Sequence, residues 1–418
     1  MRVLTTAMPH THSVSVGFYL GVGSRYETDA DEGNSHFIEH MLFKGTPRRP
    51  SPEAIATEIE GRGGIFNGHT GQEMTHYWAK VAQPHLDVAL DVLTDMLRHA
   101  RFAPEEVERE RRVIADELDM TLDQPDSLVS LLINRTSWPD HPLGRDIAGS
   151  RASVTTRQRE QLLTFKERHY TPRNTVVSVA GNLDHKAVLE RLTALLSDWK
   201  GPEPPGYAPA PPPPDRPRLA VHHKDTQQTH LILRVPGLPR HHPDRFALAL
   251  LNTILGEGMS SRLFLQVRER LGLAYAIDSQ VAFLSDTGVM EVYAALEPTC
   301  TEAAAGVILQ EWQKLRSAPV ETAELQRAKE FSKGRLLLGL EDSMAVAGWW
   351  GQQELLRGEA WSVDDIIAAV DAATTADIQR LAGQCFQGQR LSLAVVGPME
   401  GSASLRSLLD EAGERLPA

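Results

Sequence analysis

The sequence predicts an α+β fold built as two similar units in tandem, and three observations support this. The apolar, β-branched segment Leu391–Pro398 repeats the character of Val176–Asn182. Each half of the chain mixes strand-like and helix-like hydrophobic patterns. A Pro-rich segment, residues 201–218, separates the halves. We therefore expect a duplicated α/β-sandwich unit, each copy an antiparallel-rich sheet with helices.

The expected organisation follows from the Pro-rich segment, whose sequence is GPEPPGYAPAPPPPDRPR. Such a segment is extended and cannot form a core, so it indicates a semi-rigid spacer. A proline-rich ligand for an aromatic groove is the alternative, but a position between two folded halves favours the spacer. We expect a first domain at 1–200, a linker at 201–218 and a second domain at 219–418.

The expected elements of the first half alternate between strand and helix patterns. Ser51 followed by Pro52 indicates the start of a helix, and Gly63-Gly64 indicates a turn. Strands are expected at 13–20, around 67, at 74–81 and at 175–181; helices are expected at 33–46, 51–61, 85–99, 104 to about 133, 156–170 and 185–199.

The second half repeats this outline. Strands are expected at 220–235, 274–296 and 391–398, with a helix at 243–255 and further helices after the middle strands. The adjacent pairs His222-His223 and His241-His242 are not expected to bind metal, because neighbours in a strand point to opposite faces.

Bulk composition excludes several classes of protein. The chain has 418 residues and a net charge of −12, which argues against a nucleic-acid partner. No apolar run reaches the length of a membrane span, so no membrane association is expected. The N-terminus has no apolar signal region, so a cytoplasmic location is the expectation. Cys300 and Cys385, the two cysteines, are expected to be free thiols.

The central motif is His36-x-x-Glu39-His40. In a helix, residues four apart lie on one face, so His36 and His40 can share one tetrahedral Zn²⁺. Glu39 lies beside them and can serve as the general base of metal-assisted hydrolysis. The order is the inverse of the common H-E-x-x-H and is that of inverzincins. The alternative is a helix with two incidental histidines, because a zinc site needs a third protein ligand.

A second helix supplies candidates for that ligand. Val107, Ile114 and Leu118 recur at helical spacing after Pro104 and predict an apolar face. Two acids, Glu110 and Glu117, are seven residues apart and share a face of the same helix.

These motifs together resemble the pitrilysin/insulinase family of zinc peptidases, in particular the short-chain branch that includes the mitochondrial processing peptidase. The resemblance implies that His36, His40 and Glu117 bind one Zn²⁺ per chain. It also implies that Glu39 is the general base and that Glu110 supports the site from behind the ligands.

Further segments resemble signatures of the same family. Asn67-Gly68-His69-Thr70 is similar to an edge strand with Asn-Ala-x-Thr, with Gly68 in place of the usual Ala. Residues 141–145 and 260–275 are similar to two more signatures. The second of these carries an Arg/Tyr pair that maps onto Arg268 and Tyr275. The resemblance implies that Arg268 grips a substrate carbonyl and that Tyr275 steadies the oxyanion.

The expected function is that of a zinc endopeptidase for unfolded peptides or presequence-like segments, bound as an added strand near Asn67 and Gly68. Because the metal motif and the Arg/Tyr pair lie in different halves, the halves are expected to form a clam-like chamber. The expected partners are peptide substrates and a second copy of the chain, with a related chain in a heterodimeric processing peptidase as an alternative. A non-catalytic core or scaffold subunit is the rival from another class.

Overall fold

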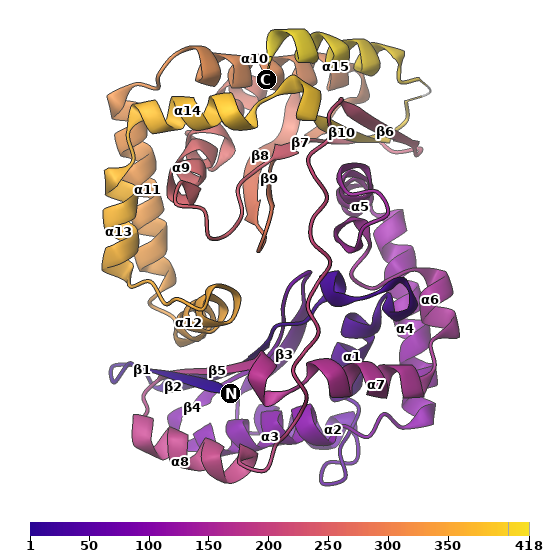
Figure 1. Cartoon of the computed structure of the whole chain (residues 1–418), viewed down its shortest axis with the longest axis vertical. Helices are drawn as coiled ribbons and strands as arrows, with labels where there is room; N and C mark the ends of the chain where they lie inside the picture. The colour runs from indigo at the N-terminus through magenta and orange to yellow at the C-terminus, as the bar shows by residue number, and fades with distance from the viewer. Residues whose placement is uncertain (400, 418) are drawn as a thin grey trace. The chain divides into compact units, whose positions relative to one another are not determined.

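The computed structural model describes residues 1–399 and 401–417 and divides into two compact units, each with its own five-stranded mixed sheet. Figure 1 shows both sheets and the helices of each unit. Among the described residues, no helix is both long and apolar enough to span a membrane.

The first unit contains a sheet in the order β1-β5-β2-β4-β3. Its edge strand β1 pairs in parallel with β5, and the other pairs are antiparallel. The strands are β1 (Arg2–Ala7), β2 (Ser13–Leu20), β3 (Ile65–Thr70), β4 (Thr75–Ala82) and β5 (Thr175–Gly181). Every residue of β5 is buried, as its run of β-branched residues predicts for a central strand.

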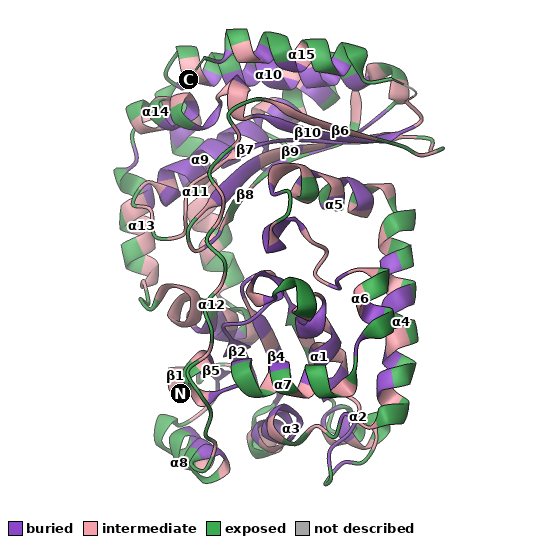
Figure 2. Ribbon diagram, turned by 45° about the vertical axis from the view of Figure 1, so that its right-hand side comes forward, coloured by how far each residue is buried: buried purple, intermediate pink, exposed green. Residues whose placement is uncertain are grey.

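The helices of the first unit bury one face each against this sheet or against one another. Figure 2 shows the exposed side of α4 in green and its buried side in purple. The helices are α1 (Asn34–Leu42), α2 (Pro52–Glu60), α3 (Leu86–His99), α4 (Pro104–Asp123), α6 (Arg151–Thr156), α7 (Arg159–His169), α8 (His185–Leu196) and α12 (Ser343–Arg357).

The second unit repeats the strand arrangement, in the order β6-β10-β7-β9-β8. Its edge strand β6 is parallel to β10, and the other pairs are antiparallel. The strands are β6 (Arg218–His223), β7 (Thr229–Pro236), β8 (Ala274–Phe283), β9 (Gly288–Leu296) and β10 (Ser392–Gly397). The helices are α5 (Pro125–Ser137), α9 (Arg245–Gly256), α10 (Thr301–Ser317), α11 (Thr322–Gly339), α13 (Val363–Ala372), α14 (Thr375–Cys385) and α15 (Ala403–Arg415).

The expected tandem duplication of an α+β unit is therefore confirmed. Position by position, β1 to β5 correspond to β6 to β10 in their order across the sheet. The similar segments Val176–Asn182 and Leu391–Pro398 contain β5 and β10, which are each the second strand of their sheet.

The two halves exchange a helix, so the compact units differ from the ranges 1–200 and 219–418. Helix α12, from the C-terminal half, packs against β2, β5 and β1 of the first sheet. Helix α5, from the N-terminal half, packs against β10, β7 and β6 of the second. A sheet face left open by the helices of its own half is thus covered by a helix of the other half, because exposed apolar sheet surface is unfavourable.

Close packing holds α12 on the first sheet. A Cβ at Gly351 would lie 2.3 Å from the Tyr19 ring, so the helix backbone lies directly on that ring. The Ser343 hydroxyl is hydrogen bonded to the hydroxyl of Ser15 at 2.8 Å, and Lys80 pairs with Asp342.

The expected single helical stretch from Pro104 to about Ile133 is wrong in one respect. Helix α4 ends at Asp123 and a new helix begins at Pro125, whose ring cannot continue the preceding helix. The Pro-rich segment has no helix or strand up to Pro217, and β6 begins at Arg218. Within the first unit, Tyr207 of this segment lies against the Arg25 guanidinium, 4.1 Å from the ring centre.

Candidate metal centre

Helix α1 carries the central motif. Its buried positions form one face that packs into the core of the first unit: Phe37, Ile38, Met41 and Leu42. His36 and His40 lie on another face, with ring centres 4.6 Å apart. The helical spacing of the apolar residues therefore directs both imidazoles to the same side of α1.

Helix α4 supplies the carboxylates. Val107, Ile114 and Leu118 are buried in the core of the first unit, as their spacing predicts. Burial of this face directs the acids Glu110 and Glu117 towards α1. Glu110 Oε2 lies 2.9 Å from His40 Nδ1, and Glu117 Oε2 lies 3.6 Å from His40 Nε2.

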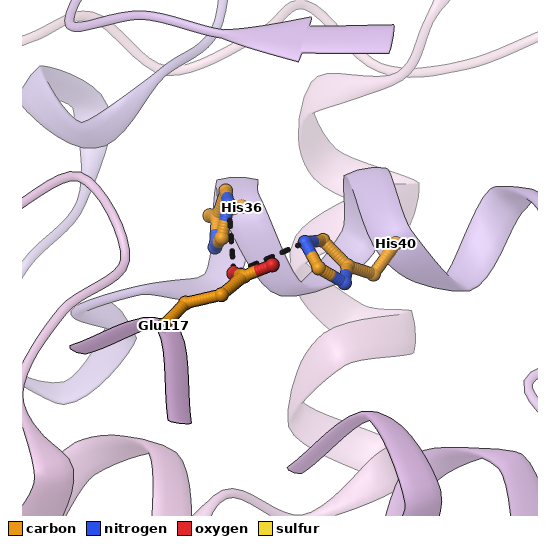
Figure 3. A group of neighbouring side chains, drawn as sticks. All are labelled: His36, His40 and Glu117. Atoms are coloured by element: carbon orange, nitrogen blue, oxygen red, sulfur yellow. Dashed lines mark ion pairs between the residues drawn. The ribbon is translucent and has the colours of Figure 1, made fainter. Parts of the chain in front are cut away.

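His36, His40 and Glu117 form the single group of metal-ligating side chains found in the part of the chain that the structure describes. Their three candidate donor atoms all lie within 4.8 Å of one another. Glu117 Oε2 lies 3.8 Å from His36 Nε2 and 3.6 Å from His40 Nε2, and Figure 3 shows the carboxylate reaching both rings.

Glu110 holds the ring of His40. Its Oε2 lies 2.9 Å from His40 Nδ1, and its Oε1 lies 2.7 Å from Lys44 Nζ. Burial raises the pKa of Glu110, but the bonds from His40 and Lys44 outweigh burial and hold the pKa below its ordinary value. An ionised carboxylate only accepts, so Nδ1 of His40 carries a proton, and Nε2, on the side of Glu117, is the nitrogen left for a metal ion.

His36 is held neutral. Burial, followed by the charges of His40 and His69, lowers the pKa of His36 to about 3. A metal ion binds the neutral imidazole, so His36 needs no deprotonation before it can act as a ligand.

The donor set fits Zn²⁺. A tetrahedral zinc ion with bonds of about 2.0–2.1 Å places its ligand atoms about 3.4 Å apart. The two carboxylate-to-imidazole separations of 3.6 and 3.8 Å are slightly wider, and all three donor atoms lie within 4.8 Å of one another, so closure of the set would seat the ion. Two imidazole nitrogens with one carboxylate oxygen leave a fourth position open, as in catalytic rather than structural zinc sites.

Glu39 lies beside this set but outside it. Its Oε2 accepts a hydrogen bond from the Thr70 hydroxyl of β3. Burial raises the pKa of Glu39, and the bond from Thr70 partly opposes this. A raised pKa suits a carboxylate that must accept a proton and then release it.

The edge strand β3 lies against α1 and brings Asn67 and Gly68 near Glu39. A Cβ at Gly68 would lie 3.0 Å from Glu39 Cγ, so the strand passes close to the base. Asn67 is exposed, and its side-chain oxygen accepts the Gly68 N–H at 2.9 Å. Among the described strands, β3 pairs with β4 alone and its other edge is unpaired.

Arg268 and Tyr275 lie in the second unit. Arg268 is exposed on the π-helix Phe264–Arg270 and lies over the Phe264 ring, 4.9 Å from its centre. Tyr275 is 59% exposed and lies at an irregularity of β8, between the paired residues Ala274 and Ala276. Neither side chain is a core residue, and their roles at substrate stay predictions.

Two neighbours of the site were missed by the sequence analysis. Lys44 follows His40 by four residues, and this spacing could have suggested it, although α1 already ends at Leu42. Thr70 lies in the segment already singled out for its backbone, but nothing in the sequence shows that its hydroxyl meets Glu39.

The fold and the donor set together define a protein of duplicated α+β units whose first unit carries a candidate mononuclear metal centre. A family model described as insulinase (peptidase family M16) matches residues 2–151, and one described as the peptidase M16 inactive domain matches residues 157–331. The chain belongs to this pitrilysin/insulinase-like family. Its central motif lies within the first of the two matched regions.

Relatives cover nearly the whole chain. An uncharacterized zinc protease of Streptomyces coelicolor is 35% identical over 97% of this chain and 89% of its own length. An uncharacterized zinc protease of Bacillus subtilis is 34% identical over 95% of this chain and 96% of its own. The crystal structure of a protease from Helicobacter pylori matches with a TM-score of 0.89 and 25% identity, covering 94% of this chain and 96% of that one.

Proposed function

We propose that the chain is a zinc-dependent endopeptidase that hydrolyses unfolded peptides. One observation carries the proposal: His36, His40 and Glu117 present three donor atoms within 4.8 Å, and a fourth side chain, Glu39, stands beside them held by Thr70. The family and the names of its relatives agree with this chemistry.

Each residue has a part in the proposed reaction. His36, His40 and Glu117 would hold Zn²⁺, which when bound supplies Lewis acidity and lowers the pKa of water. Glu39 accepts the proton of the attacking water and passes it to the leaving amine. Glu110 fixes the His40 ring, and Lys44 holds the other oxygen of Glu110.

The proposed substrate binds as a strand added to the unpaired edge of β3. The Thr70 hydroxyl bonds Glu39, so a peptide paired along Asn67 and Gly68 would lie next to the base. Main-chain hydrogen bonds would give affinity with little sequence preference. Such binding requires an extended backbone and therefore excludes folded proteins. Arg268 and Tyr275 are proposed to bind substrate on the strength of the family resemblance.

The test combines metal content with cleavage. The purified protein should contain about one zinc per chain, and chelation should abolish cleavage of an unstructured fluorogenic peptide until zinc is restored. Glu39→Gln should keep its zinc and lose about 10²–10⁴-fold in kcat. A zinc-loaded wild type without cleavage would favour the scaffold alternative. We also propose that the chain forms a homodimer, as expected from the sequence, and analytical ultracentrifugation of the pure chain tests this.

A further inference from the structure

The carboxyl group of Glu27 lies at the N-terminus of helix α1. Its Oε2 accepts the Gly33 N–H at 2.8 Å, and its Oε1 accepts the Ser35 N–H at 2.7 Å. The side chain is buried, with 3% of its surface exposed. Burial of a carboxyl group costs free energy unless the group forms hydrogen bonds. Both oxygens of Glu27 form such bonds, and both bonds are with the start of α1.

The start of α1 has no cap of its own. The N-cap is Gly33, which has no side chain and a φ of 85°. Backbone N–H groups in the first turn of a helix lack intrahelical partners and need them from elsewhere. Glu27 therefore replaces a capping side chain, from six residues before the cap.

The position of His36 makes this cap relevant to the metal. His36 is the third residue of α1, which is nine residues long, so this ligand lies in the turn where a helix frays first. His40 is held by Glu110 at its Nδ1, whereas Nδ1 of His36 is buried without a hydrogen-bond partner among the described residues. Apart from Glu117, whose Oε2 lies 3.8 Å from its Nε2, the ring of His36 therefore depends on the backbone of the first turn for its position.

The loop between Glu27 and α1 is tied down as well. Arg157, itself buried, donates to the carbonyl oxygen of Ala30 and, at 2.7 Å, to that of Glu32. A Cβ at Gly33 would lie 2.6 Å from the carbonyl oxygen of Ala148, so the helix start fits against residues 148–149. These contacts hold the segment that carries Glu27 in a fixed path.

We propose that Glu27 is a positioning residue for the metal centre: by holding the Gly33 and Ser35 N–H groups it fixes the first turn of α1 and, through it, the His36 ligand. This inference rests on the proposed zinc site. It predicts that Glu27 sets zinc affinity without touching the ion.

The test compares Glu27→Ala and Glu27→Gln with Glu73→Gln. Glu73 is a matched control because it is equally buried, with 4% exposed, and its Oε1 pairs with Arg25 at 2.6 Å. A glutamine at position 27 can accept a hydrogen bond from only one of the two N–H groups of Gly33 and Ser35. Its NH₂ group is a donor and cannot accept from the other. Zinc dissociation constants come from competition with a chromophoric chelator, and hydrogen exchange of residues 34–42 is measured by mass spectrometry in the metal-free proteins.

The expected result is a rise in the zinc dissociation constant of about 10–100-fold for Glu27→Ala, as for other groups that orient ligands, and a smaller rise for Glu27→Gln. Exchange in residues 34–42 should quicken in both. Glu73→Gln should lower the melting temperature and leave both readings unchanged. If Glu27→Ala does not fold, Glu27→Gln decides the matter.

The proposal is overturned if Glu27→Gln melts earlier but binds zinc with the affinity of the wild type. It is also overturned if Glu73→Gln weakens zinc binding as much as Glu27→Gln, since the effect would then be general loss of stability. A wild type that binds zinc without cleaving peptide would overturn the proposed peptidase and leave the role of Glu27 standing.

Discussion

Lys44 Nζ lies 2.7 Å from Glu110 Oε1, on the oxygen opposite the one that holds His40 Nδ1. Lys44 thus helps to keep Glu110 ionised, and Glu110 in turn fixes which nitrogen of His40 is available to a metal. The relay runs from the ammonium group of Lys44, two residues past the end of α1, through a carboxylate on α4 to an imidazole on α1.

Lys44→Met should weaken zinc binding while every ligand stays in place. Without the ammonium group, burial raises the pKa of Glu110 and weakens its hold on His40. Zinc titration should show a loss of about 10-fold or less, below the roughly 10–100-fold expected of Glu110→Gln. Lys80→Met is the control, since Lys80 pairs with Asp342 at α12. Unchanged affinity in Lys44→Met would contradict the relay.

The ligand assignment predicts a ranking among variants. His36→Ala, His40→Ala and Glu117→Gln should each lose most of the bound zinc, because each removes one of three donors. Glu110→Gln should retain zinc at higher concentrations. Metal content after dialysis against a weak chelator measures this. Loss of zinc in Glu110→Gln with retention in Glu117→Gln would mean that the two acids have been assigned in the wrong order.

Arg268→Ala and Tyr275→Phe should leave zinc content unchanged. Arg268→Ala should mainly raise KM if the side chain grips substrate and transition state alike, whereas Tyr275→Phe should mainly lower kcat if its hydroxyl meets the oxyanion alone. Steady-state kinetics on one fluorogenic peptide, with a melting curve, measures both. Tyr275 is 59% exposed, so we expect Tyr275→Phe to leave the melting temperature unchanged. A Tyr275→Phe protein with a lower melting temperature and unchanged kinetics would contradict the proposed role.

Gly351→Ala should loosen α12 from the first sheet. The new Cβ would lie 2.3 Å from the Tyr19 ring, which a close-packed contact cannot absorb, so we expect a loss of about 1–3 kcal/mol in the free energy of unfolding. Gly348→Ala, on the same helix, would meet the Tyr19 hydroxyl at 3.8 Å and should be neutral or stabilising. Urea denaturation compares them. Equal stability of the two variants would argue against this packing of α12.

His76 should make the metal-free protein sensitive to acid. Burial, followed by the charge of His69, lowers the pKa of His76 to about 4 in the folded protein, against about 6.5 when unfolded. Between these values the unfolded chain binds more protons, so the free energy of unfolding falls as the pH falls, by up to about 1.4 kcal/mol per pH unit.

His76→Phe keeps a ring to stack on Tyr19, whose ring centre lies 5.5 Å away, and removes the titrating group. Urea denaturation of the metal-free protein at pH 7, 6 and 5 should show a shallower loss of stability in the variant. Parallel curves for variant and wild type would show that another group is responsible.

Much of the candidate site could be predicted because its information is local. Residues four apart on a helix share a face whatever surrounds them, so the placement of His36 and His40 follows from α1 alone. The apolar spacing of Val107, Ile114 and Leu118 likewise settles which face of α4 is buried, and with it the side from which Glu117 projects. The Pro-rich segment and the repeated strand pattern predict the duplication for the same reason.

Contacts between distant segments were decided by the tertiary structure. The bonds from Glu27 to the start of α1 and from Thr70 to Glu39 depend on how loops and strands meet in space, and no local pattern encodes them. The exchange of α5 and α12 is the largest such case. The amphipathic pattern of a helix predicts that one face is buried, but it does not predict which apolar sheet surface covers that face. The chain path therefore decides which sheet each helix covers.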